Sequence, residues 1–397
     1  MIRVAVIFES SPFDRKGLFN AVHNRVKALL ATGECWVDVF CIHARDNAFT
    51  RRVRHTASVP YVNHVDVDGI TYRMLWYRFS ILDHITLEKF GKRPVLFGDF
   101  MRRHVGMLQG YDVVVAHSFT GALFAYEASV RYDIPYFVTW HGSDVHTHPW
   151  RVPVIREDTA KVMNAACCNF FVSRALMAES ERITSDARKD VLYNGVSEGF
   201  VRLDEVRRAE IRASYGIDDD AKVVAFVGNL VSVKNVLSLP DIFTAVSGGF
   251  DGKLQFVVAG DGKLRRQLEA TCPAELNVSF LGNVPSGDMP SLMNCIDVLV
   301  LPSLNEGLPL VCAEALSCGA DVVGSDVGGI PEVIGRENVA ALGPDFVSQI
   351  SQKIVAKLKK DRSDACSQGL SSEFSWARTA ERELVCLARL HGQIVEN

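Results

Sequence analysis

The chain has no apolar segment long enough to cross a membrane or to form the core of a secretory signal. None of its 397 residues falls in an uninterrupted apolar run of about 18, and the first apolar stretch ends at Glu9. The ten cysteines include no C-x-x-C pair and no Cys/His spacing suited to zinc. We therefore expect a cytoplasmic protein whose cysteines are reduced thiols in the core.

Two widespread enzyme signatures are incomplete. Gly260-Asp261-Gly262 follows an apolar stretch, but Arg265 stands where the dinucleotide fingerprint has its third glycine. Gly324-Ser325-Asp326 places its serine wrongly for a nucleophile elbow. No cluster of metal-ligating residues appears in the sequence either. NAD binding is thus not expected, and we predict neither a metal ion nor another cofactor.

The composition is that of a globular protein with two domains. Hydrophobic residues make up 48% and charged residues 23%, and 397 residues exceed the usual size of one domain. Residues 1–190 carry 24 basic and 20 acidic side chains, whereas residues 191–397 carry 19 basic and 27 acidic side chains. A mildly basic first half suits an anionic ligand or a membrane surface, and a solvated face explains it equally well. No basic patch typical of nucleic-acid binding is present.

Apolar stretches typical of strands alternate with stretches of helical spacing in both halves. This order predicts α/β units with parallel sheets and helices on both faces. The expected strands cover 3–8, 37–42, 112–116, 136–140, 223–228, 254–259, 278–281, 298–301 and 321–325. The expected helices include 17–30, 120–132 and an amphipathic segment over 375–392. The stretch 45–110 is irregular, with a two-strand excursion around Gly69 and several arginines, and we expect ligand or membrane contacts there.

Two glutamates eight positions apart form the most informative segment. Residues 296–303 read as a buried strand that ends in a loop, so Glu306 should lie at the carboxyl end of this strand. Glu314 should lie in the first or second turn of the helix that follows. Open α/β sheets bind ligands at this edge, where carboxylates can accept sugar or ribose hydroxyls and a helix N-terminus can bind phosphate. The alternative is a helix-capping glutamate beside a solvated one.

This segment resembles the Glu-x7-Glu signature of retaining GT-B glycosyltransferases of family 4, the glycosyl transferases of group 1. The resemblance extends over roughly half of the chain, through residues 191–199, 223–235, 257–262, 278–297 and 328–332. It implies an α/β fold of two facing Rossmann-like domains, with a C-terminal helix that crosses back to the first. We therefore expect an N-terminal acceptor-side domain at 1–192 with the helix 375–397, and a C-terminal nucleotide-sugar-binding domain at 193–374.

The resemblance also assigns roles to individual residues. Lys234 would neutralise the departing diphosphate, and Glu306 would hold the hydroxyls of the donor sugar. His141, in a His-Gly-x-Asp loop, would face the donor sugar and its β-phosphate, and Glu314 would hold the ribose hydroxyls. The remaining donor-binding positions are Gly17, Asn229, Gly260, Asp261, Lys263, Val284, Gly307, Leu308 and Pro309.

Two positions depart from the family pattern. Asn229 stands where the family has a phosphate-binding arginine, which removes one cation unless Lys263, Arg15 or Lys16 replaces it. Only Gly17 remains of a Gly-Gly loop at the start of the first helix. The ordinary structural alternatives for these motifs are a surface lysine, a strand-exit turn at each glycine and a structural histidine.

The expected activity is metal-independent transfer of a hexose-type sugar, with retention, from a UDP- or GDP-sugar to a hydroxyl. The resemblance points to a glycan, a lipid-linked molecule or a small molecule as acceptor, in polysaccharide or glycoconjugate biosynthesis. The enzyme would be cytoplasmic, with peripheral association at the inner face of the membrane left open. The alternatives are a non-catalytic nucleotide-sugar or glycan-binding protein and a GT-B sugar epimerase, which fits the motifs less well.

Overall fold

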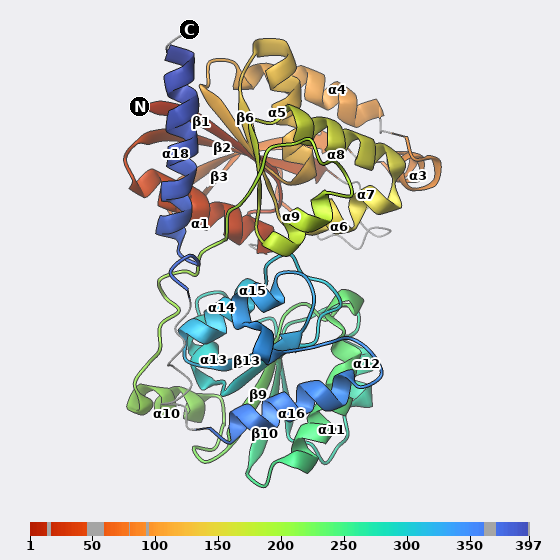
Figure 1. The fold of residues 1–397 in the computed structure, drawn as a ribbon, viewed down its shortest axis with the longest axis vertical. Helices are drawn as coiled ribbons and strands as arrows, with labels where there is room; N and C mark the ends of the chain where they lie inside the picture. The colour runs from red at the N-terminus through yellow and green to blue at the C-terminus, as the bar shows by residue number, and fades with distance from the viewer. Residues whose placement is uncertain (14–16, 46–58, 79, 93–94, 361–370, 396–397) are drawn as a thin grey trace. The chain divides into compact units, whose positions relative to one another are not determined.

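The computed structural model describes residues 1–13, 17–45, 59–78, 80–92, 95–360 and 371–395, and the chain divides into two compact units (Figure 1). The N-terminal unit comprises Met1–Gly195 and Ser375–Asn397, and the C-terminal unit comprises Val196–Phe374. Each unit is built around one largely or wholly parallel sheet with helices packed on it, which confirms the predicted fold class.

The N-terminal sheet has eight strands in the order β3-β4-β2-β1-β5-β6-β7-β8. All neighbouring strands are parallel except the antiparallel pair β3 and β4. The direction of winding reverses between β1 and β5, which are neighbours in the sheet. The strands are β1 (Ile2–Glu9), β2 (Cys35–Arg45), β3 (His64–Val67), β4 (Ile70–Arg78), β5 (Val113–His117), β6 (Tyr136–Trp140), β7 (Cys168–Phe171) and β8 (Lys189–Val191).

The hairpin of β3 and β4 is part of this sheet rather than an excursion from it. β4 pairs in parallel with β2, so the hairpin extends the sheet by two strands at one edge. Asp68 and Gly69 have φ angles of 50° and 82°, as a tight two-residue hairpin turn requires. Arg51, Arg52 and Arg54, from the basic stretch in which we expected ligand or membrane contacts, lie outside the described residues.

Helices of the N-terminal unit bury apolar stripes against the sheet. The first helix, α1 (Gly17–Ala31), buries Phe19, Val22, Val26 and Leu29 in the core at helical spacing. The helices that follow are α3 (Ile81–Phe90), α4 (Val95–His104), the 3-10 helix η1 (Val105–Leu108), α5 (Ser118–Tyr132), α6 (Ser143–His146), α7 (His148–Arg151), α8 (Pro153–Ala165) and α9 (Arg174–Ser180).

The C-terminal helix α18 (Trp376–Val395) belongs to the N-terminal unit and packs against α1 (Figure 1). Its Leu387 lies fully buried in the same apolar core as Val22 of α1. The Nε atom of Arg25 on α1 lies 2.6 Å from Oε2 of Glu383, and the two side chains are 2% and 1% exposed. A buried pair of this kind is costly to break from one side, because the remaining charge loses its partner. The predicted return of the C-terminal helix to the N-terminal part of the chain is thus confirmed.

The C-terminal sheet has six parallel strands in the order β11-β10-β9-β12-β13-β14. Its central strands are almost continuously apolar and buried, which is typical of a parallel sheet covered on both faces. The strands are β9 (Lys222–Val227), β10 (Leu254–Ala259), β11 (Val278–Gly282), β12 (Val298–Leu301), β13 (Asp321–Ser325) and β14 (Val339–Ala340). The helices are α10 (Glu205–Ser214), α11 (Leu239–Gly249), α12 (Arg265–Thr271), α13 (Met289–Cys295), α14 (Leu310–Ser317), α15 (Ile330–Ile334) and α16 (Phe346–Leu358), with 3-10 turns η2 (Ser232–Lys234), η3 (Val236–Ser238) and η4 (Arg336–Asn338).

The nine cysteines that the structure describes are free thiols, and burial raises the pKa of each. The pKa reaches about 12 for Cys41 and Cys318. Thiols with such pKa values are poor nucleophiles at neutral pH, so these cysteines act as small apolar side chains. No helix within the described part of the chain combines the length and the apolar character that crossing a membrane requires.

Candidate functional site

Lys234 and Glu306 meet at the carboxyl edge of the C-terminal sheet. Lys234 follows β9 and Glu306 follows β12, and these strands are neighbours where the winding of the sheet reverses. Such a switch point is where open α/β sheets bind ligands. Lys234 Nζ lies 2.5 Å from Glu306 Oε1, and Ser303 Oγ donates a hydrogen bond of 2.7 Å to the same oxygen. An ammonium group has three N–H donors, so Lys234 keeps donors for an anion while it remains paired with Glu306.

Backbone contacts hold the loops that carry these two side chains. Leu304 N donates to Val233 O at 2.8 Å, which ties the loop after β12 to the turn that contains Lys234. Gly328, with φ of 51°, packs so closely on Glu306 that a Cβ atom would overlap the Glu306 carbonyl. The glycine-rich segment 328–332 therefore contacts the backbone of Glu306 directly.

Glu314 lies in the second turn of α14, as expected, and its side chain is partly buried. Burial raises the pKa of Glu314 from 4.5 to about 7. Within the described residues, no donor contacts its carboxylate, so nothing offsets the loss of hydration of the charged form. A ligand that donates hydroxyl protons here would stabilise the ionised carboxylate. The loop residues Gly307, Leu308 and Pro309 lead directly into the N-terminus of this helix, where backbone amides favour an anion.

The other predicted donor-binding residues lie on the loops after β9, β10 and β11. A Cβ atom on Gly260, whose φ is 132°, would overlap the carbonyl of Gly228, so the loops after β9 and β10 approach closely through their backbones. Asn229 and Lys263 are exposed, and Asp261 is 3.5 Å from the Nη1 atom of Arg265. The remaining residue of this set, Val284, is partly exposed just beyond β11.

His141 lies in the N-terminal unit, directly after β6, in a loop organised by Asp144. The Asp144 carboxylate accepts hydrogen bonds from the backbone amides of His141 at 3.2 Å and of Gly142 at 2.8 Å. Burial raises the pKa of Asp144 above its ordinary value, and these backbone donors act in the opposite direction. Asp144 thus fixes the His-Gly loop.

A second histidine, which the motif did not reveal, contacts His141. His117 Nδ1 and His141 Nε2 share a hydrogen bond of 3.0 Å. Burial, with a smaller effect from the Arg25 guanidinium, lowers the pKa of His141 to about 3, and burial also lowers the pKa of His117 well below its ordinary value. Both imidazoles are therefore neutral at physiological pH, and His141 can exchange hydrogen bonds with a sugar hydroxyl without carrying charge.

The Arg25 guanidinium, which contributes to the lowered pKa of both histidines, contacts β6 and the C-terminal helix. Its Nη1 donates to Thr139 Oγ1 at 2.8 Å, and its Nε pairs with Glu383 on α18. The sequence pattern did not indicate these buried contacts of Arg25, because an arginine on an otherwise apolar helix face ordinarily points to solvent. Gly17 begins α1 and is exposed, whereas Arg15 and Lys16, the other candidate cations, lie outside the described residues.

Two family models match the chain, one for each unit. Residues 207–368 match the model described as glycosyl transferases group 1. Residues 17–195 match the model described as a glycosyl transferase 4-like domain.

Relatives and a solved structure agree with these matches. An uncharacterized glycosyltransferase of Methanocaldococcus jannaschii is 29% identical over 254 residues, which cover 60% of this chain and 64% of the relative. A putative teichuronic acid biosynthesis glycosyltransferase of Bacillus subtilis is 27% identical over 263 residues, which cover 66% of this chain and 62% of the relative. The chain thus matches less than two thirds of the length of either relative.

The structure of Anabaena Alr3699/HepE in complex with UDP-glucose superposes with a TM-score of 0.66 over 99% of this chain and 100% of that chain, at 15% identity. At this identity the likeness shows the fold. Because the family models, the relatives and the fold agree, the chain belongs to the group 1 glycosyltransferases of GT-B fold.

Proposed function

We propose that this glycosyltransferase moves a hexose-type sugar from a nucleotide-sugar donor to a hydroxyl acceptor, with retention of the anomeric configuration. The observation that carries the proposal is the Lys234–Glu306 pair at the switch point of the C-terminal sheet, with Glu314 on the adjoining helix. This arrangement supplies a cation for a diphosphate and two separate carboxylates for hydroxyl groups. A UDP- or GDP-sugar is the proposed donor, and the binding of UDP-glucose by the Anabaena neighbour supports this class.

In this mechanism the C-terminal unit stabilises the leaving group. The remaining donors of Lys234 contact the diphosphate, while the ion pair with Glu306 holds the ammonium in place. The amides at the start of α14 add partial positive charge to the same region. Glu314, ionised once it accepts the ribose hydroxyls, fixes the nucleoside.

Glu306 binds the donor sugar in this proposal. One carboxylate oxygen of Glu306 is engaged by Lys234 and Ser303, so its other oxygen is the one that would accept a hydroxyl of the donor sugar. His141, neutral because burial lowers its pKa, would contribute hydrogen bonds rather than charge. We assign no protein nucleophile, since retention in this scheme comes from attack on the face that the diphosphate leaves.

The acceptor in this proposal is a glycan, a lipid-linked molecule or a small molecule, and the reaction belongs to polysaccharide or glycoconjugate biosynthesis in the cytoplasm. The name of the Bacillus subtilis relative supports the polysaccharide context. Peripheral association with the inner face of the membrane is part of this proposal for lipid-linked acceptors.

Transfer should survive removal of divalent metal ions. No group of three or more histidine, cysteine or acidic side chains placed to hold a metal occurs among the described residues, and Lys234 can neutralise the diphosphate instead. Activity measured after treatment with excess EDTA should match the untreated rate within about twofold. Complete loss of activity that Mg²⁺ or Mn²⁺ restores would contradict this prediction.

Gly328→Ala should lower turnover by about a hundredfold, because small displacements of catalytic groups have effects of this size. The added Cβ atom would overlap the Glu306 carbonyl and displace the loop that carries the carboxylate. Gly216→Ala is a matched control, since Gly216 also has positive φ but a Cβ atom there meets nothing within 4 Å. Both variants share a backbone strain of about 1–2 kcal/mol. Equal turnover in the two variants would show that contact with Glu306 is unimportant.

A donor screen tests the proposed function at its first step. Thermal unfolding is measured with UDP-, GDP- and ADP-sugars, since a ligand at a hundredfold excess over its Kd stabilises the folded state by about 2.7 kcal/mol. One nucleotide class should raise the Tm of the wild type and raise it less in Glu314→Ala. If no nucleotide sugar changes the Tm, the proposal falls. Binding of a donor that is never turned over would favour the alternative of a non-catalytic nucleotide-sugar-binding protein.

A further inference from the structure

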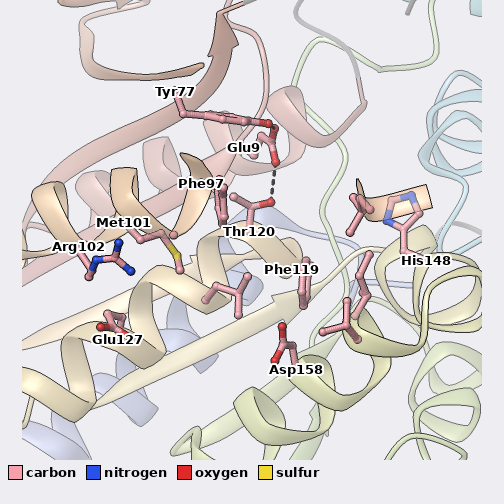
Figure 2. A pocket seen from close by; sticks show the side chains of 15 residues that line it. Glu9, Tyr77, Phe97, Met101, Arg102, Phe119, Thr120, Glu127, His148 and Asp158 are labelled. Carbon is pink, nitrogen blue, oxygen red and sulfur yellow. Dashed lines mark hydrogen bonds between the residues drawn. The ribbon is translucent and has the colours of Figure 1, made fainter. Parts of the chain in front are cut away.

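The N-terminal unit contains a cavity of about 490 Å³ that the donor site does not use (Figure 2). This volume lies within the range of small-molecule sites, about 300–1,000 Å³. The cavity lies among α3, α4, α5 and α8, and most of its wall is apolar. The apolar side chains that line it are Leu87, Phe97, Met101, Phe119, Leu123, Val154 and Ile155.

The polar end of the cavity lies at the switch point of the N-terminal sheet. Glu9 ends β1 and Thr120 follows β5, the two neighbouring strands between which the winding reverses. Figure 2 shows Glu9 between Tyr77 and Thr120, whose hydroxyls donate to its two oxygens at 2.7 and 2.6 Å. An ionised carboxylate has about four acceptor sites, so Glu9 can still accept a hydroxyl from a ligand in the cavity.

The charges on the wall disfavour an anionic ligand. The described residues that line the cavity include the carboxylates of Glu9, Glu127 and Asp158, the guanidinium of Arg102 and the imidazole of His148. A phosphate group placed beside Glu9 would meet the negative charge of this carboxylate and would lose its own hydration.

Two of these charges are already balanced locally. Glu127 Oε1 lies 2.6 Å from Arg131 Nη2, and Arg102 Nη2 lies 3.3 Å from Asp99 Oδ1. Arg102 is therefore not a cation reserved for a phosphate. The two groups that donate hydrogen bonds to Glu9 are neutral hydroxyls, so they do not neutralise the negative charge that this carboxylate presents to the cavity.

We propose that this cavity binds the apolar part of an uncharged, hydroxyl-bearing molecule, such as an aryl or alkyl glycoside, and that it excludes phosphorylated sugars. The apolar wall takes the aryl or alkyl group, and Glu9 accepts one of the hydroxyls. Only the identification of this molecule as the sugar acceptor rests on the proposed function.

Gly98 on α4 offers a way to fill the cavity without disturbing the fold. It lines the cavity, and a Cβ atom there would meet only the Arg102 Nη1 atom at 3.7 Å, an ordinary contact. Leucine and alanine both favour a helix over glycine by up to about 1 kcal/mol, so both variants should fold. Gly98→Leu places a bulky side chain into the space, and Gly98→Ala is the matched control.

The experiment measures binding of phenyl β-D-glucoside and of glucose 6-phosphate to the full chain by ligand-observed NMR titration, without any nucleotide sugar. The wild type and Gly98→Ala should bind phenyl glucoside with affinities within about twofold of each other, and Gly98→Leu should bind it at least tenfold more weakly. Glucose 6-phosphate should bind the wild type at least tenfold more weakly than phenyl glucoside. Glu9→Gln removes one negative charge and keeps the size of the side chain. In this variant the ratio of the affinities for phenyl glucoside and glucose 6-phosphate should fall by at least threefold.

Three results would overturn the proposal: no binding of phenyl glucoside, equal binding by the wild type and Gly98→Leu, or equal or tighter binding of glucose 6-phosphate. A preference that is unchanged in Glu9→Gln would overturn the part assigned to Glu9. Because no donor is present, the outcome does not depend on the proposed reaction. If the cavity binds as predicted but no nucleotide sugar binds, the cavity assignment stands and the proposed function fails.

Discussion

Lys234→Ala should reduce turnover of the nucleotide sugar by about a hundred- to a thousandfold, the usual effect of removing a group that stabilises developing charge. Lys234 is the cation at the switch point, and its ammonium is already held by Glu306 at 2.5 Å. Since Asn229 offers no positive charge, no arginine at that position can compensate. The variant also leaves Glu306 without its ion-pair partner, so the carboxylate would repel the diphosphate.

Steady-state kinetics of Lys234→Ala should show the loss mainly in kcat, because charge on the leaving group develops in the transition state. Lys263→Ala is the comparison variant, because Lys263 is an exposed lysine on the neighbouring loop and a candidate replacement for the missing arginine. Its loss should be smaller than that of Lys234→Ala, because Lys234 is the lysine that pairs with Glu306 at the switch point. A Lys234→Ala enzyme with nearly normal kcat, or a larger loss of kcat in Lys263→Ala, would contradict the assignment of Lys234 as the diphosphate ligand.

Glu314→Ala should raise the Kd for the nucleotide sugar by about one to two decades, since hydrogen bonds to a charged group contribute about 1.5–3 kcal/mol. The wild-type affinity should also depend on pH. Burial raises the pKa of Glu314 to about 7, so below pH 7 the carboxyl of the free protein is protonated and must lose a proton to accept two hydroxyls. Affinity should therefore fall as pH drops below about 7, by up to tenfold per unit, and level off above it.

Glu314→Gln supplies the control for this pH dependence, because it keeps the size of the side chain and does not titrate. Its affinity should be weak and nearly independent of pH. Its stability gives a further check: the folded state raises the pKa of Glu314 above 4.5, so the wild type loses stability as pH rises from about 4.5 to 7. The glutamine variant should therefore be at least as stable as the wild type at pH 8. Equal pH dependence of donor affinity in both proteins would remove Glu314 from the ribose site.

The sequence was sufficient for features that depend on local patterns. The strands at 136–140, 254–259, 298–301 and 321–325 occur where apolar runs predict them. Glu314 lies in the second turn of its helix, because the apolar strand and the Gly-Leu-Pro loop before it leave little freedom for the start of α14.

Contacts between distant residues could not be predicted in this way. Lys234 and Glu306 are 72 residues apart, and the sequence assigned them separate ligands, whereas the structure joins them directly. Arg25 and Glu383 are 358 residues apart, and only the return of α18 brings them together. A substitution at Lys234 or Glu306 therefore changes the electrostatics of both residues, so their effects should not be additive.

The irregular stretch 45–110 was the least predictable part of the chain. Neither α3 nor α4 was predicted, and Leu87 of α3 and Phe97 and Met101 of α4 line a cavity rather than a continuous core. The short helices α6 and α7 after His141 were also not predicted. Asp144, a residue of the motif itself, caps this turn through two backbone amides, and such local capping leaves no periodic signal.

Release of nucleoside diphosphate from UDP-, GDP- and ADP-sugars in the presence of hydroxyl acceptors is the decisive measurement. It is made with the wild type and Lys234→Ala, and the anomeric configuration of the product is determined by NMR. We expect one nucleotide class to be consumed by the wild type, with the sugar transferred in the configuration of the donor, and at most about a hundredth of that rate in Lys234→Ala. Donor binding without release, an inverted product, or full activity in Lys234→Ala would contradict the proposed reaction.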